Sequence, residues 1–127
     1  MTDAFAAITK ALQTYYDGLY HCDAALLKTV FHEDAHYHTT SPGEHLHYDM
    51  KTYMNVIAER TPPAKTGDAY GYEVETVLIT GDDTAFAVLK CAMMGKRFTD
   101  FLSFIRDGGE WRIIAKVFHY DLIEDKT

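Results

Sequence analysis

The segment from Lys96 to Asp121 constrains the fold more than any other part of the chain. It contains two runs that alternate with a period of two, separated by Asp107-Gly108-Gly109. Alternation on both sides of an Asp-Gly pair is typical of a β-hairpin. The hairpin also carries an acid, Asp100, and a base, Lys116, among apolar neighbours. A charge in such a position is either paired or functional.

Three helices are predicted before this hairpin. Apolar residues recur at helical spacing through the first twenty residues, where Thr2 or Asp3 would be the N-cap. A third helix is expected over residues 49–60, which Pro62-Pro63 ends. Between them Asp23 caps a short second helix that His32-Glu33-Asp34 breaks. Its buried stripe is predicted to be Leu26, Leu27, Val30 and Phe31.

Strands are predicted at residues 35–40, 72–80 and 84–94, followed by the hairpin. The order is α-α-β-α-β-β-β-β, and helices followed by an antiparallel meander are typical of an α+β fold. The two last strands have two apolar faces. One is expected to hold Leu102, Phe104, Ile113 and Val117, the other Phe101, Ile105, Ile114 and Phe118. A sheet with one wet face would alternate apolar with polar residues, so both faces should be covered. We expect the helices on one and a second subunit on the outer face, in a homodimer.

The composition bounds the class of protein. At 127 residues the chain is expected to be a single domain, 1–127. A net charge of −7 argues against nucleic acid and anionic membrane surfaces as partners. No signal peptide and no apolar run of about 18 residues is visible. Cys22 and Cys91 share no CxxC spacing and are interpreted as reduced, which predicts a cytoplasmic protein.

Three segments carry a family resemblance: FHEDA (residues 31–35), GKRFTDFLSFIR (95–106) and GGEWRIIAKVF (108–118). With the order of elements, they resemble the nuclear transport factor 2-like (NTF2-like) superfamily. Within it the chain looks most like the bacterial putative lumazine-binding and SnoaL-like groups. The resemblance implies a cone, in which a curved antiparallel sheet wraps around three N-terminal helices and leaves a pocket at the open end, commonly in a dimer.

The resemblance also bears on chemistry. The steroid isomerases of this superfamily use an aspartate base, with a tyrosine and a protonated aspartic acid as donors. On that pattern Tyr15 matches the donor tyrosine, but Thr39 falls at the base and Leu102 at the donor acid. Steroid isomerisation by that mechanism is therefore not expected. Dehydratase relatives combine pocket histidines with tyrosines and an aspartate, and this chain has those types in Tyr15, Tyr53, His36, His38 and Asp100.

Two interpretations of Asp100 stay open. In a cavity it would act as an acid or base, with Tyr15 and His38 as further catalytic candidates. Otherwise it is a structural residue, paired with Lys116 or satisfied by a backbone N–H or by Arg97. Binding candidates on the predicted inner face are Tyr37, Thr39, Tyr53, Leu102 and Lys116.

The histidines form two pairs, His36-x-His38 and His45-x-His47. Each pair places two imidazoles on one strand face, which is acceptable for a metal, but the spacing is poorly specific. The second pair precedes a helix in an expected exposed loop. We interpret these residues as solvent-exposed histidines near the rim of the cone, and we predict no metal site and no cofactor.

The function expected is binding of a small, mostly apolar organic molecule in the cone pocket. A cofactor-independent lyase or isomerase reaction is the sharper hypothesis. A non-catalytic ligand carrier and a dimerisation module are the alternatives. An enzyme needs two titratable groups within hydrogen-bond reach of one open cavity, a carrier needs the cavity alone, and a module needs a filled cone.

Overall fold

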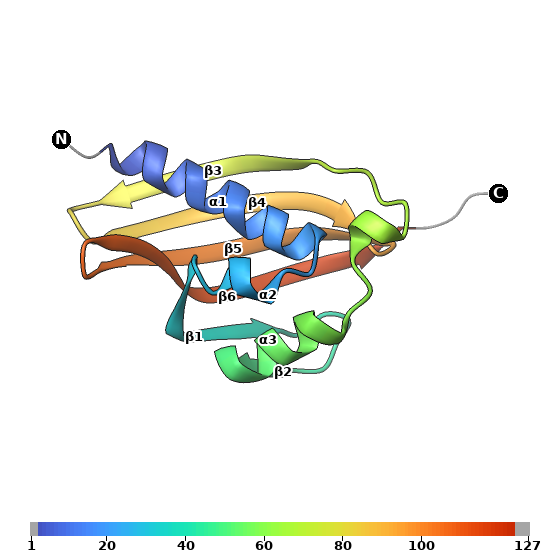
Figure 1. Cartoon of the computed structure of the whole chain (residues 1–127). Helices are drawn as coiled ribbons and strands as arrows, with labels where there is room; N and C mark the ends of the chain where they lie inside the picture. The colour runs from blue at the N-terminus through green and yellow to red at the C-terminus, as the bar shows by residue number, and fades with distance from the viewer. Residues whose placement is uncertain (1–2, 124–127) are drawn as a thin grey trace.

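The structure is a computed structural model that describes residues 3–123. Its helices are α1 (Ala4–Tyr20), α2 (Ala24–Leu27), α3 (Met50–Glu59) and the 3-10 turn η1 (Pro63–Lys65). Its strands are β1 (Phe31–Thr39), β2 (Leu46–Asp49), β3 (Tyr72–Thr80), β4 (Thr84–Met93), β5 (Lys96–Asp107) and β6 (Glu110–Leu122). The six strands form one curved sheet in the order β2-β1-β6-β5-β4-β3, and the helices lie against one of its faces (Figure 1). The predicted α+β fold is confirmed.

Aspartate side chains cap the three α-helices. Asp3 accepts hydrogen bonds from the backbone N–H groups of Phe5 and Ala6. Asp23 caps α2 and Asp49 caps α3 in the same way. Such caps satisfy orphan N–H groups and each stabilises a helix by about 1 kcal/mol. The helix starts therefore follow from local sequence, as predicted.

The boundary between the second helix and the first strand differs from the prediction. Helix α2 ends at Leu27, and Val30 and Phe31 are buried without belonging to it. Phe31 begins β1 and pairs with Ile113 of β6, whose backbone N–H donates to Val30 O at 2.8 Å. Pairing with a distant strand overrides the helical spacing here, and residues 32–34 belong to β1 rather than to a helix break.

Strand β2 is absent from the prediction, which placed residues 45–47 in a loop. Leu46 and His47 instead lie in β2, which pairs antiparallel with β1 and forms one edge of the sheet. With a length of only four residues, β2 is too short to show a clear period-2 pattern. Its partner strand supplies the hydrogen bonds that define it.

A β-bulge in the hairpin changes which residues share a face. Ser103 pairs with Ala115 and Phe104 with Ile113, so Ile114 is the extra residue. Beyond the bulge the inward and outward positions of β6 are exchanged. Val117 is 48% exposed on the outer face and Phe118 only 7% exposed on the inner face. The predicted assignment of Val117 and Phe118 is therefore wrong, and the two exchange faces.

The core lies between the helices and the inner face of the sheet. Helix α1 contributes Ile8, Leu12 and Tyr15, and α3 contributes Tyr53, all fully or almost fully buried. These two helices thereby bring tyrosines over the inner faces of β5 and β6. Among residues 3–123, no helix is long and apolar enough to cross a membrane.

Candidate functional site

Two opposite charges lie buried on the inner face of the hairpin. Asp100 of β5 is 1% exposed and Lys116 of β6 is 5% exposed. Lys116 Nζ lies 4.0 Å from Asp100 Oδ2, and the hydroxyl of Tyr15 donates to the same oxygen at 2.6 Å. The bulge at Ile114 orients Lys116 inward, because it exchanges the faces of β6. The two charges are therefore neighbours inside the fold.

Aromatic rings surround the Lys116 ammonium group. Its Nζ lies 4.9–5.6 Å from the ring centroids of Tyr15, Tyr37, Tyr53 and Phe118. It also donates to the Tyr53 hydroxyl at 3.4 Å. A desolvated cation–π contact contributes about 2 kcal/mol or more. These rings offset part of the cost of burying a charge, in addition to the Asp100 carboxylate.

The second carboxylate oxygen of Asp100 has no partner. Asp100 Oδ1 is buried, and the residues of the described range 3–123 provide it with no hydrogen bond. Leaving such an acceptor unsatisfied costs about 1–3 kcal/mol or more. It is therefore the atom of this cluster at which an added hydrogen-bond donor would gain most.

A cavity of about 200 Å³ adjoins the cluster. Asp100, Lys116 and Tyr53 line it together with aromatic side chains that include Phe98 and Phe118. Its other charged lining residues are Arg60 and Lys96. Three bases thus accompany one acid, although the whole chain has a net charge of −7. The cavity combines an apolar wall with a locally positive charge balance.

A second, wider depression of about 700 Å³ lies elsewhere on the molecule. Its lining includes Met50 and Met54 but also the exposed charged residues Lys28, Glu33 and Lys51. Exposed charges are solvated and bind weakly. We place the candidate site in the smaller cavity, because buried titratable groups line it.

Burial keeps the tyrosines of the site protonated. It raises the pKa of Tyr15 well above its usual value, and the Asp100 charge raises it further. The pKa of Tyr37 rises to about 12, because burial outweighs the opposing effect of Lys116. The pKa of the Cys91 thiol also rises to about 12, through burial and then Asp100. At neutral pH the tyrosines are hydrogen-bond donors, and Cys91 is no thiolate nucleophile.

Residues 3–119 match the family described as putative lumazine-binding. The chain belongs to this family. No curated protein matches the sequence. The match spans nearly the whole chain and confirms the resemblance that the hairpin segments indicated.

Solved structures share the fold of this family member over almost its full length. An NTF-2 like protein of unknown function from Silicibacter pomeroyi DSS-3 is 25% identical, with a TM-score of 0.79 over 95% of this chain and 100% of that one. An NTF2-like protein of unknown function from Shewanella baltica OS155 is 21% identical, with a TM-score of 0.82 over 95% and 98%. A ketosteroid isomerase-like protein from Erwinia carotovora atroseptica is 14% identical, with a TM-score of 0.72 over 94% and 98%. The chain thus has the nuclear transport factor 2-like fold.

Five of the predicted site residues of this family member come together. Asp100, Tyr15, Lys116, Tyr53 and Tyr37 lie within one cluster of hydrogen bonds, an ion pair and cation–π contacts. Asp100 is paired with Lys116 and also lines the cavity, so its position does not decide between the two interpretations.

Thr39 also lines the cavity, whereas Leu102 and His38 are not among its lining residues. The Thr39 hydroxyl donates to Phe118 O at 2.7 Å and accepts from Ser41 N. Leu102 is fully buried in the core. His38 pairs with Val117 in register and therefore lies on the outer face of the sheet, opposite Tyr37 and Lys116. It does not join the Asp100 cluster.

Several lining residues were not predicted as site residues, among them Tyr48, Phe98, Tyr120 and Arg60. Phe98 precedes Asp100 by two positions, so alternation alone could have identified it. Placing Tyr120 in the cavity requires knowledge of the bulge in β6, and placing Tyr48 there requires knowledge of strand β2. Arg60 ends α3, and no local signal directs it to the cavity.

Proposed function

We propose that the protein binds a small, mostly apolar organic molecule in the cavity beside Asp100, and that the molecule donates a hydrogen bond to Asp100 Oδ1. The observation that carries this proposal is the buried, unpartnered Oδ1 of a residue that lines the cavity. Buried polar atoms are almost always satisfied in proteins, and an exception calls for an explanation. A ligand donor is the explanation that the position of Asp100 supports.

The cavity limits what such a ligand can be. At about 200 Å³ it is smaller than the roughly 300–1,000 Å³ of pockets for drug-sized molecules. Its aromatic wall favours a compact, planar body, and Arg60 and Lys96 favour a ligand that is neutral or weakly acidic. One ring or two fused rings with an N–H or O–H donor meet these requirements. Lumazine, which has two fused rings and N–H groups, is a reasonable first probe for this family member.

The test uses pairs of probes that differ only in the donor. Lumazine and other small N–H heterocycles are titrated beside their N-methylated counterparts, and amide signals are followed by two-dimensional NMR. We expect the N–H compounds to shift the amide signals of Phe98, Asp100 and Lys116. The methylated compounds should bind at least about tenfold more weakly, because one hydrogen bond to a charged group contributes about 1.5–3 kcal/mol. Equal binding of both members of each pair, or shifts confined to other regions, would overturn the proposal.

Acid–base catalysis is a second candidate, favoured by the short hydrogen bond from Tyr15 to Asp100. A carboxylate with a tyrosine donor and a neighbouring ammonium group can take a proton from carbon and stabilise the resulting oxyanion. This would make the protein a cofactor-independent lyase or isomerase. Lys116 and Tyr53, rather than His38, would accompany Asp100 and Tyr15, because His38 lies on the other face.

This catalytic candidate has its own assay. Small β,γ-unsaturated ketones and β-hydroxy ketones are incubated with the protein in D₂O, and NMR follows double-bond migration, water loss and deuterium uptake next to the carbonyl. Catalysis predicts turnover that Asp100→Asn abolishes while ligand binding is measured separately. A protein that binds probes in the cavity but exchanges no carbon-bound proton is a carrier.

We also propose a homodimer through the outer face of the sheet. Leu78, Phe101 and Val117 are large apolar residues on that face, and each is half exposed. An apolar sheet face of this kind indicates an interaction site. The expected result of sedimentation velocity at about 20 μM is a dimer, which Phe101→Lys converts to a monomer. A monomeric unmodified protein would remove the idea.

The cytoplasm is the proposed location. Cys22 and Cys91 are both free, and free cysteines are typical of reducing compartments. Fractionation of the producing cells, with detection of the untagged chain, tests this location, and recovery from the periplasm would contradict it.

A further inference from the structure

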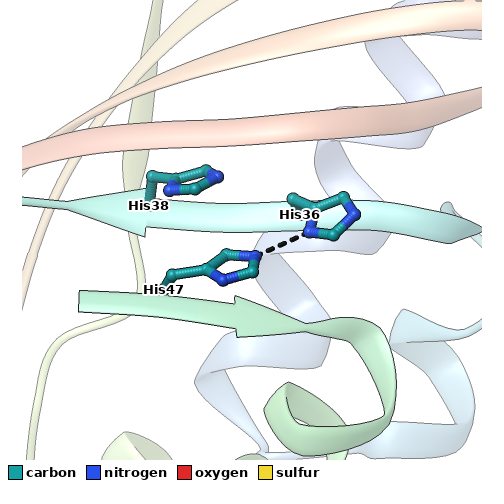
Figure 2. A group of neighbouring side chains, drawn as sticks. All are labelled: His36, His38 and His47. Atoms are coloured by element: carbon teal, nitrogen blue, oxygen red, sulfur yellow. Dashed lines mark hydrogen bonds between the residues drawn. The ribbon is translucent and has the colours of Figure 1, made fainter.

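The structure brings three histidines together on the outer face of the sheet. His36 and His38 alternate with buried residues on β1, and His47 lies directly opposite His38 on β2. Antiparallel pairing places such opposite side chains about 4.5–5.5 Å apart at Cβ. Figure 2 shows the three rings gathered over the two neighbouring strands, with His36 directed at His47. The sheet separates this cluster from the cavity.

The distances between the rings suit a metal ion. One ring nitrogen from each histidine can be chosen so that all three lie within 4.8 Å of one another. His36 Nδ1 and His47 Nε2 are 2.6 Å apart. Around tetrahedral zinc, Zn–N bonds of about 2.0–2.1 Å place the nitrogens about 3.3 Å apart. His36 and His47 are exposed and His38 is half-buried, so small rotations of the rings are enough to reach that spacing.

The imidazole rings of the cluster stack closely on one another. The rings of His38 and His47 stack at 4.4 Å and those of His36 and His47 at 4.9 Å. Neutral imidazole is the form that binds metals.

One acidic residue near the cluster and the net charge of the chain add to the attraction for a cation. Asp49 lies opposite His36 in register, and its carboxylate caps α3 through Thr52 N. The whole chain has a net charge of −7, which raises the local concentration of cations. The fourth histidine of the segment, His45, lies close to the cluster, with Nε2 3.0 Å from His38 Nδ1.

We propose that His36, His38 and His47 form a binding site for one divalent transition-metal ion per chain, zinc above all. Imidazole ligands suit zinc, copper and nickel, and three histidines leave the fourth position to water. His45 is a positioning residue, because its hydrogen bond fixes the ring of His38. The site departs from the sequence-based expectation, because β2 places the His45-x-His47 segment beside β1 rather than in a loop.

Metal titration of the tag-free protein tests the site. Zinc chloride is added in a calorimeter, and cobalt chloride in a spectrophotometer, where tetrahedral Co²⁺ gives strong visible bands. The expected result is one equivalent per chain and intense cobalt bands. The combined variant His36→Ala and His47→Ala should bind zinc at least about 100-fold more weakly than the unmodified protein. His45→Ala removes only a supporting hydrogen bond and should weaken zinc binding by a smaller factor, roughly 10- to 100-fold.

A matched control is His119→Ala, which removes an exposed histidine paired with Asp121 outside the cluster. It should bind zinc as the unmodified protein does, and circular dichroism should show that every variant is folded. Binding far below one equivalent would overturn the site, as would equal affinity of the combined variant. A loss of binding in His119→Ala equal to that in the combined variant would also refute it.

Discussion

Replacing Asp100 with asparagine tests whether the buried charges of this fold depend on each other. In the folded protein Lys116 Nζ lies 4.0 Å from the Asp100 carboxylate, and both side chains are almost fully buried. Two unit charges at that distance attract by about 4 kcal/mol when the effective dielectric constant is near 20. Asparagine can still accept the hydrogen bond from Tyr15, but it leaves the buried ammonium group without an anion.

We therefore expect Asp100→Asn to lower the free energy of unfolding by about 3–5 kcal/mol, the usual cost of removing one partner of a buried pair. Adding Lys116→Met to that variant should restore part of the loss, because no uncompensated charge then stays buried. Urea unfolding is followed by circular dichroism and by the fluorescence of Trp111. Protein concentration is held constant, because unfolding of a dimer depends on it.

Two results would refute this reasoning. A loss below about 1 kcal/mol in Asp100→Asn would mean that the pair contributes little and that Asp100 is free to act on a ligand. A double variant less stable than Asp100→Asn would mean that the aromatic rings around Lys116, rather than Asp100, hold the charge. The double-mutant cycle separates the pair from its surroundings.

Three further predictions concern other residues of the core. Gly18→Ala should destabilise the protein by about 1–3 kcal/mol in thermal unfolding, because the added Cβ would lie 2.6 Å from Leu27 Cδ2. Cys91 should react slowly with a disulfide reagent at pH 8. Its pKa in the folded protein, about 12, exceeds the usual 9.0. The contribution of the buried neutral thiol to the free energy of unfolding is therefore complete below pH 9 and is lost as the pH rises toward 12. Tyr15→Phe should cost about 1.5–3 kcal/mol in urea unfolding, because Asp100 Oδ2 loses its short hydrogen bond.

Each of these has a control and a result that would contradict it. Gly43→Ala meets no atom within 4 Å and should be nearly neutral, whereas a stabilised Gly18→Ala would mean that helix propensity outweighs the clash. Denatured protein supplies the reference rate for Cys91, and equal rates in folded and denatured protein would contradict burial of the thiol. The control for Tyr15→Phe is Tyr16→Phe, because the Tyr16 hydroxyl accepts a hydrogen bond from Gly71 N and touches no charge. Equal losses of unfolding free energy in the two variants would contradict a larger contribution from the contact with Asp100.

Local patterns in the sequence predicted most elements. The Asp3, Asp23 and Asp49 caps lie within three residues of the N–H groups they accept from, so the helix starts could be read directly. Period-2 alternation and the glycines at residues 108–109 located the hairpin. The same patterns singled out Asp100 and Lys116 as charges that needed an explanation.

Long-range pairing decided the rest. The end of α2 depends on the pairing of Phe31 with Ile113, and strand β2 exists because β1 lies beside it. The Ile114 bulge, visible only in the register of β5 with β6, exchanged Val117 and Phe118 between the faces. No local spacing shows an extra residue in a strand, because alternation continues unchanged along the sequence itself.

The sequence by itself thus determined the fold class, the helix caps, the hairpin and the chemical types available for a site. Tertiary structure alone decided that Tyr15 and Asp100, 85 residues apart, share a hydrogen bond, and that His36, His38 and His47 share the opposite face. The physical reason is range. Caps, turns and periodicity act over a few residues, whereas a site is made of side chains that only packing and strand register bring into contact.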